Sequence, residues 1–292
     1  MLFLELLLQG LVQGGIYILI ALGLTLVYGL LRILHVAHAA LFTLGGYLGV
    51  IVTNATGSLL LGFAVSLPVV GFVGIAMYEV VYRPILHKPP YVALIASIGI
   101  FIAAEELFRI VFGPYGISYA EPHLDGVLAL GGGVAIRTAE VAALAGAILA
   151  IAILWLLATR TRTGIAWRAT VTDPTMAESF GISVRQVRYL NFFIGSAMAA
   201  AAGIMVGLLN NLVEPGMGAV PSYKALAIIV LGGLGSIPGA LAAAIALGII
   251  EAFGTIYLSG ILDRDAIAFA FLIAVLMLRP NGLFARRDTN AR

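Results

Sequence analysis

Few residues of this sequence have side chains that could do chemistry, and most of them stand alone. The chain has no cysteine, which excludes thiol catalysis and cysteine metal sites. The four histidines are His35, His38, His87 and His123. They are scattered and form no ligand set with the carboxylates, so we expect no metal centre. Ser97 and Ser196 have no histidine placed convincingly as a base, which argues against a serine hydrolase.

The carboxylates in apolar stretches are more informative. Glu105 and Glu106 precede Arg109 by about one helical turn, which favours ion pairs at a helix end. Glu251 lies deeper, in ALGIIEAFGTIYL, with no neighbouring base in sequence. A carboxylate in hydrocarbon costs roughly 2.5 to 3.5 kcal/mol, so Glu251 either lines a pathway or makes a buried structural bond. His38 is likewise either a packing residue or a pathway residue.

The composition around these residues is that of a polytopic membrane protein. Of 292 residues, 62% are hydrophobic and 10% are charged, and the mean hydropathy is +1.09. Soluble domains are about half apolar and a quarter charged. The apolar runs are continuous and do not alternate, which indicates transmembrane helices and not a barrel. The net charge of +2 gives no sign of nucleic-acid binding.

Apolar segments recur along the chain and predict an all-α membrane protein with about eight to ten transmembrane helices. They fall at about 3–31, 36–54, 58–80, 91–112, 138–158, 188–209, 223–235, 239–258 and 266–279. The opening MLFLELLLQG lacks the basic region of a cleavable signal, so we expect a retained first span.

The segment at 223–235 is too short to cross a full bilayer and ends in GGLGSIPGA. A helix broken at membrane depth needs protein or water around its free backbone groups, so such a break is a pathway candidate. The alternative is an ordinary turn between two spans. The candidate pathway residues are His38, Glu251, Gly233, Gly235, Ser236 and Pro238.

One long polar segment, about 159–187, interrupts the spans with TRTRTGIAWRATVTDPTMAESFGISVRQV. Asp173 is a good helix N-cap, Pro174 suits the first turn, and Gly181 suits the end, so a two-turn helix is predicted. Ser183 and Gln186 form a capping box for the next helix.

A helix of two turns is not stable alone in water and needs a surface to dock on. Met176 and Phe180 lie four residues apart on one side of this helix, which favours docking on a soluble partner. The alternative is a loop that packs on its own membrane domain.

Lysine and arginine placement predicts the orientation. Positive charges stay on the cytoplasmic side, which assigns that side to the polar segment, to Arg83 and Lys88, and to the arginine-rich tail. The N-terminus is then outside and the C-terminus cytoplasmic. The segment at about 113–137, with a short β-prone piece, becomes an external loop that could meet whatever delivers substrate.

Three parts of the sequence resemble permease subunits of ATP-binding cassette (ABC) importers of the branched-chain amino acid type. GIAWRATVTDPTMAESFGIS resembles the cytoplasmic loop of that family and keeps Gly164, Arg168, Ala169, Ala177, Gly181 and Ile182. GGIYILIALGLTLVYGLLRILHVAHA resembles the opening family pattern, and VLGGLGSIPGALAAAIALGIIEAF and LRPNGLF resemble the closing ones. His35, Val36 and Ala39 depart from the family's INFAHG, whereas Ala37 and His38 are kept.

The resemblance implies one transmembrane domain over 1–292 with the type II ABC importer fold (BtuC- and ribose-permease-like), in a bacterial-type inner membrane. It implies that the polar segment grips an ATPase. The implied coupling residues are Gly164, Arg168, Asp173, Pro174, Met176, Ala177, Phe180 and Gly181. No phosphate-binding Gly-Lys-Ser/Thr loop occurs, so ATP and magnesium would bind on partner subunits and this chain would hold no cofactor.

The implied partners are a second, related permease subunit or a second copy, two ATPase subunits, an extracytoplasmic substrate-binding protein and membrane lipid. The implied substrates are branched-chain amino acids or a related small polar solute such as urea, an amide or an aromatic acid. An ion-coupled secondary transporter is the alternative. It would need an intramembrane relay, and the few carboxylates lie mostly near span ends.

Overall fold

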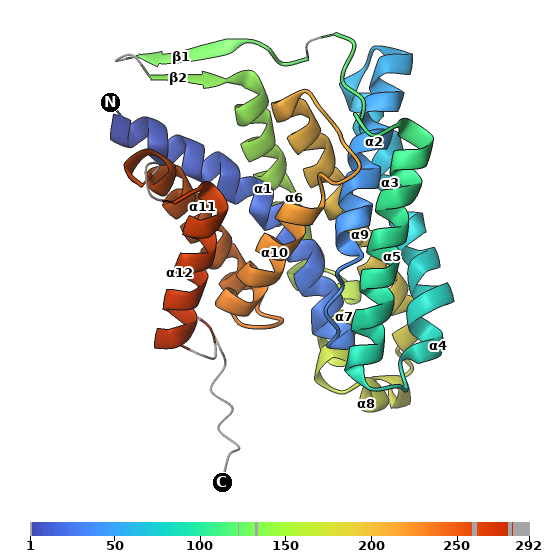
Figure 1. Cartoon of the computed structure of the whole chain (residues 1–292). Helices are drawn as coiled ribbons and strands as arrows, with labels where there is room; N and C mark the ends of the chain where they lie inside the picture. The colour runs from blue at the N-terminus through green and yellow to red at the C-terminus, as the bar shows by residue number, and fades with distance from the viewer. Residues whose placement is uncertain (1, 122, 132–133, 259–261, 280–281, 283–292) are drawn as a thin grey trace.

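The computed structural model describes residues 2–121, 123–131, 134–258, 262–279 and 282. The described chain is mostly helical, with one two-stranded sheet (Figure 1). Seven helical stretches are long and apolar enough to cross a membrane. They are α1 (Leu2–Leu31), α2 (His38–Thr56), α3 with its continuation (Leu59–Ile85), α5 (Pro90–Phe112), α6 (Thr138–Arg160), α9 (Val184–Asn210) and α11 (Ile237–Tyr257). The predicted all-α polytopic fold is confirmed.

Two further helices of the described chain correspond to predicted apolar segments but are shorter. α10 (Ala219–Gly232) has 14 residues and α12 (Arg264–Leu278) has 15. At about 1.5 Å per residue each spans roughly 21 to 23 Å, less than the roughly 30 Å of hydrocarbon in a bilayer. Together with the seven long stretches, they match the nine predicted apolar segments to within a few residues. The short predicted segment at 223–235 is therefore a real short helix, α10.

Helix α1 forms the centre of the bundle. It is buried from Gly14 to Val27 and packs against α6, α9, α10 and α11. Glycines allow this contact, because a Cβ on Gly10 would lie 2.7 Å from the Cα of Ile249 in α11. Small residues let helix backbones approach where lipid supplies no hydrophobic drive.

The same device joins α2 to α9. A Cβ on Gly45 would lie 2.3 Å from the Cα of Ala200, and a Cβ on Gly203 would lie 2.0 Å from the carbonyl oxygen of Phe42. The small residues of GSAMAAAAGIMVG therefore act in helix packing.

The polar segment contains one helix more than its local signals predicted. The expected two-turn helix is α8 (Pro174–Ser179), and the expected next helix is α9. Between α6 and α8 lies a further helix, α7 (Arg162–Thr172). The signal for α7 was Thr161, whose hydroxyl accepts a hydrogen bond from the Gly164 N–H at 3.1 Å as an N-cap.

Helix α3 (Leu59–Met77) does not end in an ordinary α-helical turn. It continues into a π-helical turn, η1 (Tyr78–Tyr82), and then into the short helix α4 (Arg83–Ile85). The Arg83 N–H donates to the Tyr78 carbonyl, which is the i to i−5 bond of a π-helix. No sequence signal predicted this turn.

The expected external loop holds the sheet. Strands β1 (Val127–Gly131) and β2 (Val134–Arg137) form an antiparallel hairpin, with Val127 opposite Arg137. The preceding loop is tied to the helices by Asn54, whose side chain bonds the carbonyl of Ser118 and the N–H of Ala120 at 3.0 Å each. The hairpin and the α7–α8 segment lie at opposite ends of the molecule (Figure 1).

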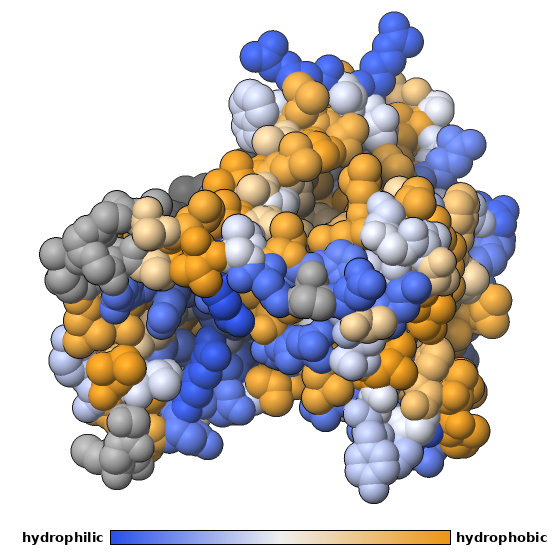
Figure 2. Space-filling view, turned by 90° about the horizontal axis from the view of Figure 1, so that it is seen from above, coloured by the Kyte–Doolittle hydropathy of each residue, from blue (hydrophilic) through white to orange (hydrophobic). Residues whose placement is uncertain are grey.

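Seen from the hairpin end, hydrophilic side chains form a band across the middle of the molecule, with much hydrophobic surface around it (Figure 2). Apolar side chains are widely exposed on the long helices, among them Leu60, Ile102 and Ile148 at 78%, 60% and 58%. In water such a surface would associate, whereas against lipid it is stable.

The glycine contact between α2 and α9 predicts a stability difference. Gly45→Ala is expected to destabilise the protein by about 1 to 3 kcal/mol, because the new methyl group overlaps the backbone of Ala200. Gly99→Ala in α5 is the matched control, since a Cβ there meets nothing within 4 Å. Thermal unfolding in detergent measures both variants, and equal midpoints would contradict the described α2–α9 packing.

Candidate coupling segment and pathway residues

Helix α7 is bound to the end of α6 by two of the expected coupling residues. Gly164 is buried, and a Cβ on it would lie 2.3 Å from the carbonyl oxygen of Ala158, so only glycine allows this approach. The Arg168 guanidinium donates to the same carbonyl of Ala158. A cation at a helix C-terminus satisfies free carbonyls and complements the helix dipole. Gly164 and Arg168 therefore fix α7 at the end of α6.

Helix α8 forms as its local signals predicted. The Asp173 carboxylate accepts a hydrogen bond from the Met176 N–H at 3.0 Å, Pro174 lies in the first turn, and the chain leaves the helix at Gly181 with φ +80°. Met176 is 55% exposed and Phe180 is 80% exposed, whereas Ala177 is 3% exposed. The helix thus packs on the protein through Ala177 and presents a large apolar pair to the surroundings.

The turn after α8 connects it rigidly to α9. The Ile182 N–H donates to the Ala177 carbonyl at 3.0 Å, and the Ser183 hydroxyl accepts from the Gln186 N–H at 3.4 Å. Val184 and Val187 in the first turn of α9 are 3% and 7% exposed. The end of α8 and the start of α9 are therefore connected by hydrogen bonds and by buried side chains.

Sequence reasoning missed a polar cluster beside this connection. Glu79 in η1 accepts hydrogen bonds from Arg185 and Tyr189 of α9, each at 2.7 Å, and also pairs with Arg83. Glu79 and Arg185 are separated by 106 residues in the chain. The sequence did contain one signal for this cluster. Glu79 lies at the end of an apolar segment, and Arg83 follows it four residues later.

The expected ion pairs of Glu105 and Glu106 are present. The Arg109 guanidinium lies 3.3 Å from the Glu105 carboxylate and 2.9 Å from the Glu106 carboxylate. All three side chains are at least a quarter exposed, so these are surface pairs at the end of α5. Such pairs contribute little to stability.

Glu251 lies at the centre of a buried charge network. Its side chain is fully buried, and its carboxylate lies 2.8 Å from the Lys224 ammonium of α10 and 2.8 Å from the Arg264 guanidinium of α12. The Tyr17 hydroxyl of α1 donates to it at 2.6 Å. Lys224 also contacts Asp265 at 2.8 Å. Two cations and two anions balance, which is the condition under which buried charges are tolerated.

This network gives Glu251 the buried structural bond that the sequence left as one of two interpretations. It joins the two short helices, α10 and α12, to α1 and α11. Each of these four helices supplies at least one of its members. The network therefore fixes the position of α10, which is too short to be anchored at both faces of a bilayer.

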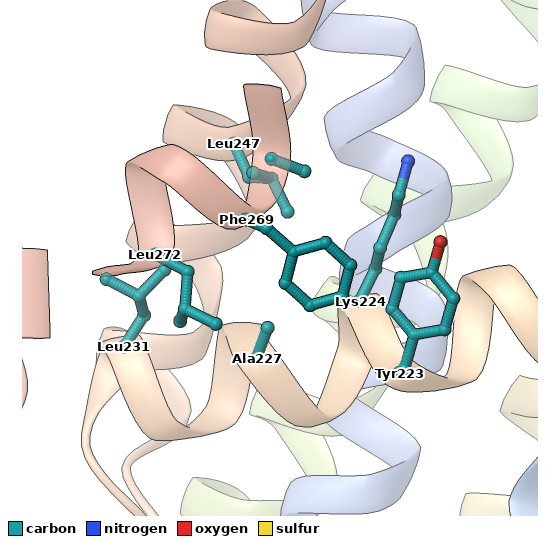
Figure 3. Close-up of a pocket in the computed structure, with 8 residues that line it drawn as sticks. Tyr223, Lys224, Ala227, Leu231, Leu247, Phe269 and Leu272 are labelled. Atoms are coloured by element: carbon teal, nitrogen blue, oxygen red, sulfur yellow. The ribbon is translucent and has the colours of Figure 1, made fainter. Parts of the chain in front are cut away.

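A small recess lies between α10 and α12 beside Lys224. Its lining is apolar apart from Tyr223 and Lys224, whose polar ends lie together at one side of it (Figure 3). Ala227, Leu231, Leu247, Phe269 and Leu272 form most of the wall. Because Lys224 is already paired with Glu251 and Asp265, the recess offers an apolar surface and no free charge.

Residues 32–37 form a non-helical junction between α1 and α2, and His38 follows it as the first residue of α2. It is 1% exposed, and its ring packs edge-on against that of His35, with centroids 5.7 Å apart. The His35 Nδ1 and the Tyr82 hydroxyl share a hydrogen bond of 2.6 Å. The Ala37 N–H donates to the Ser97 hydroxyl of α5 at 2.8 Å. Polar side chains thus hold this buried break in the helices.

The glycine-rich segment after α10 is a short turn between two helices. Gly233 and Gly235 have φ of +98° and +80°, which favours glycine, and the Ser236 hydroxyl caps α11 by accepting from the Gly239 N–H at 3.2 Å. Pro238 lies in the first turn of α11. The structure thus shows a tight turn between α10 and α11, and a place for this turn on the pathway stays a prediction.

The structure does not bring the candidate pathway residues into one cluster within the part of the chain that it describes. His38 lies at the α1–α2 junction, Glu251 in the charge network, and Gly233 to Pro238 in the turn. Their roles in a pathway stay predictions. In the same described part, no group of three or more histidine or acidic residues could hold a metal ion.

Comparison with known proteins identifies relatives along almost the whole chain. Residues 6–278 match the family model described as "Branched-chain amino acid transport system / permease component". The chain is 33% identical over 300 residues to the high-affinity branched-chain amino acid transport system permease protein LivH of Escherichia coli (strain K12), covering 98% of this chain and 96% of LivH. It is 33% identical to BraD of Pseudomonas aeruginosa, covering 98% of this chain and 97% of BraD.

A second permease of Escherichia coli (strain K12) is also similar. The chain is 28% identical to LivM of Escherichia coli (strain K12), covering 92% of this chain and 67% of LivM. Among solved structures, "PsaBC from Streptococcus pneumoniae in complex with Fab" is similar in fold, with a TM-score of 0.50 and 13% identity, covering 94% of this chain and 91% of that one.

The charge network predicts a large stability effect at Glu251. Glu251→Gln is expected to destabilise the protein by about 3 kcal/mol, the lower end of the effect of breaking a buried ion pair, because it removes the fully buried partner of Lys224 and leaves this lysine only the partly exposed Asp265. Glu106→Gln, which removes an exposed pair with Arg109, is the control and is expected to cost less than about 1 kcal/mol. Thermal unfolding of both detergent-solubilised variants is the measurement, and a control-sized effect at Glu251 would rule out the network.

Proposed function

The chain belongs to the family of permease components of branched-chain amino acid transport systems, and on that premise we propose that it is the membrane-spanning permease subunit of an ABC importer. The domain over 1–292 forms one half of a transmembrane pathway. It carries a cytoplasmic coupling segment at about 159–187 and an external loop at about 113–137.

The observation that supports coupling to an ATPase is the surface of α8. A capped two-turn helix presents Met176 and Phe180 outward, with 55% and 80% of each exposed, at the end of the molecule opposite the hairpin. Exposed large apolar side chains on a polar, non-spanning segment are typical of a docking surface. The partner is a soluble ATPase subunit that receives this pair in a groove.

ATP hydrolysis takes place on two partner ATPase subunits, which hold ATP and magnesium. The chain itself contributes no phosphate-binding motif and needs no cofactor for this role. Its part in the reaction is mechanical. Movement of α8 reaches the spans through its rigid connections to α6 by way of α7 and to α9 by way of Ser183.

The second permease half is a different but related chain. The similarity of this sequence to both LivH and LivM, two permeases named in one organism, supports such a pairing. An extracytoplasmic binding protein delivers substrate to the face that bears the hairpin. The protein lies in a bacterial-type inner membrane, with the N-terminus outside and the C-terminus in the cytoplasm.

Branched-chain amino acids are the substrate that we assign, because the relatives at 33% identity are named for their transport. Urea, amides and aromatic acids are the related solutes to test beside leucine, isoleucine and valine. Competition for uptake in membranes that contain the complete importer separates these substrates.

The rival function, an ion-coupled secondary transporter, has less support in the described residues. A proton or sodium relay needs carboxylates that are free to change charge. Glu251 is paired with Lys224 and Arg264, and Glu105 and Glu106 are paired with Arg109. Substrate uptake by this chain alone, without any ATPase, would establish the rival function.

Replacing both Met176 and Phe180 with Asp is expected to abolish recovery of the ATPase subunits with the permease, because two carboxylates would be buried in the apolar contact. The variant still inserts, since both side chains are exposed. Tyr115→Asp, at a 90% exposed residue near the other end, is the control and keeps normal recovery. Pull-down from solubilised membranes is the measurement, and undiminished recovery of the ATPase would exclude α8 as the contact.

The orientation is tested with single cysteines, since the chain has none of its own. Ser118→Cys and Thr172→Cys, both exposed in the structure, are expected to react with an impermeant maleimide from opposite sides of the membrane. Ser118→Cys reacts in intact spheroplasts, and Thr172→Cys reacts only in inverted vesicles. Reaction of both residues from the outside would overturn the proposed topology.

A further inference from the structure

A polar clamp joins the first turns of α9 to the end of α3. The Arg185 Nη2 donates to the Glu79 Oε1 at 2.7 Å, and the Tyr189 hydroxyl donates to the Glu79 Oε2 at 2.7 Å. Arg185 also donates to the Tyr189 hydroxyl and lies over its ring, with the guanidinium carbon 5.2 Å from the centroid. Each oxygen of Glu79 therefore accepts a hydrogen bond from a different side chain of α9, and both bonds are charge-assisted.

The clamp follows directly after the coupling segment. Arg185 is the second residue of α9, and α9 is joined to α8 by the bond from the Ile182 N–H to the Ala177 carbonyl. Nothing flexible separates the exposed pair Met176 and Phe180 from Arg185 except the tight turn at Gly181. Displacement of α8 therefore pulls on Glu79.

Glu79 is placed on an element that can change its register. It lies in the π-helical turn η1, whose hydrogen bonds close over one residue more than those of an α-helix. A shift of these bonds by one residue would change the position of Glu79 while α3 and α4 on either side stay helical. Single π-helical turns occur frequently at functional sites.

The same turn contacts the buried junction between α1 and α2. Tyr82, the last residue of η1, is fully buried, and its hydroxyl shares the 2.6 Å hydrogen bond with His35 Nδ1. Phe192 of α9 packs beneath both, with ring centroids 5.7 Å from Tyr82 and 5.6 Å from His35. His38, the first residue of α2, directly follows this junction, and its ring also packs on that of His35.

We infer that Glu79 is a positioning residue for coupling, which transmits the displacement of α8 through η1 and Tyr82 to the α1–α2 junction at His35. The inference rests on the proposed function and goes beyond it, because it assigns the route by which the ATPase acts on the centre of the bundle. The contacts run without a gap from Arg185 to Glu79, along η1 to Tyr82, and from there to His35.

The test is ATP-driven uptake of radiolabelled leucine by the complete importer, with both permeases, the ATPase subunits and the binding protein in proteoliposomes. The measured quantity is leucine taken up per ATP hydrolysed. Glu79→Gln is expected to lower it by about three-fold or more, within the range that substitutions in coupling networks produce. Arg185→Gln is expected to lower it similarly, because it removes the partner charge of the same clamp.

The matched control is Glu105→Gln. Glu105 also pairs with an arginine four residues later, and its side chain is 28% exposed against 30% for Glu79, but it lies at the end of α5 in a surface pair with Arg109. Its substitution is expected to leave the ratio unchanged. A Glu79→Gln importer with the ratio of the unsubstituted importer would overturn the inference, and so would a parallel loss of folded complex with an unchanged ratio.

A cross-link supplies the rescue. In a Glu79→Cys, Tyr189→Cys double variant the ratio is expected to be low before treatment and to recover when a bifunctional thiosulfonate joins the two cysteines, because a covalent link replaces the clamp. A cross-linked importer that stays uncoupled would count against transmission through this contact.

Failure of the proposed function and failure of the role of Glu79 give different results in this experiment. If the unsubstituted complex shows no ATP-driven leucine uptake, the proposed function is wrong and the inference falls with it. If it transports leucine and Glu79→Gln matches Glu105→Gln, only the role of Glu79 is wrong.

Discussion

Close contact between helix backbones is the constraint on which the rest of this structure depends. Apolar side chains gain no hydrophobic free energy when they move from lipid to a helix interface, because lipid is as apolar as they are. Membrane helices therefore associate through dispersion forces between closely fitting surfaces. Helix α1 meets this constraint with Gly10 and Gly14 against α11, and Gly248 of α11 would place a Cβ 2.5 Å from the Gly10 carbonyl oxygen. The buried α1 then provides the surface on which α6, α9 and α10 pack.

Polar groups inside such a bundle must find partners within it, and they do so at separate places. The network of Glu251, Lys224 and Arg264 holds the two short helices, which cannot be anchored at both membrane faces. The clamp at Glu79 and the hydrogen bond between Tyr82 and His35 hold the end of α3 and the α1–α2 junction. The first arrangement is buried at Glu251 and Lys224, whereas Arg264 and Asp265 reach the surface. The second is partly exposed and includes a π-helical turn.

This division fits a permease driven from one end. Helices α7 and α8 leave the membrane domain as a compact segment, fixed to α6 by Gly164 and Arg168 and to α9 by the cap at Ser183. The exposed pair Met176 and Phe180 is thus connected to two spans at once. The glycine contacts of α1 with α11 make the centre of the bundle close-packed, and close-packed interiors transmit strain.

The amino-acid sequence by itself determined the positions of the apolar helices and the caps of α8 and α9, because hydropathy, Asp173 and Ser183 act through neighbours a few residues away. It did not determine how many helices cross a membrane, since we predicted eight to ten and seven described helices are long enough to do so. Local signals missed α7, because Thr161 is a weak cap among several threonines. They could not place the π-helical turn, nor decide between a pathway role and a structural bond for Glu251. Only the tertiary structure decided that Glu251 meets Tyr17, 234 residues away, and that Glu79 meets Arg185, 106 residues away. Such contacts depend on how whole helices pack, and no short stretch of sequence contains that information.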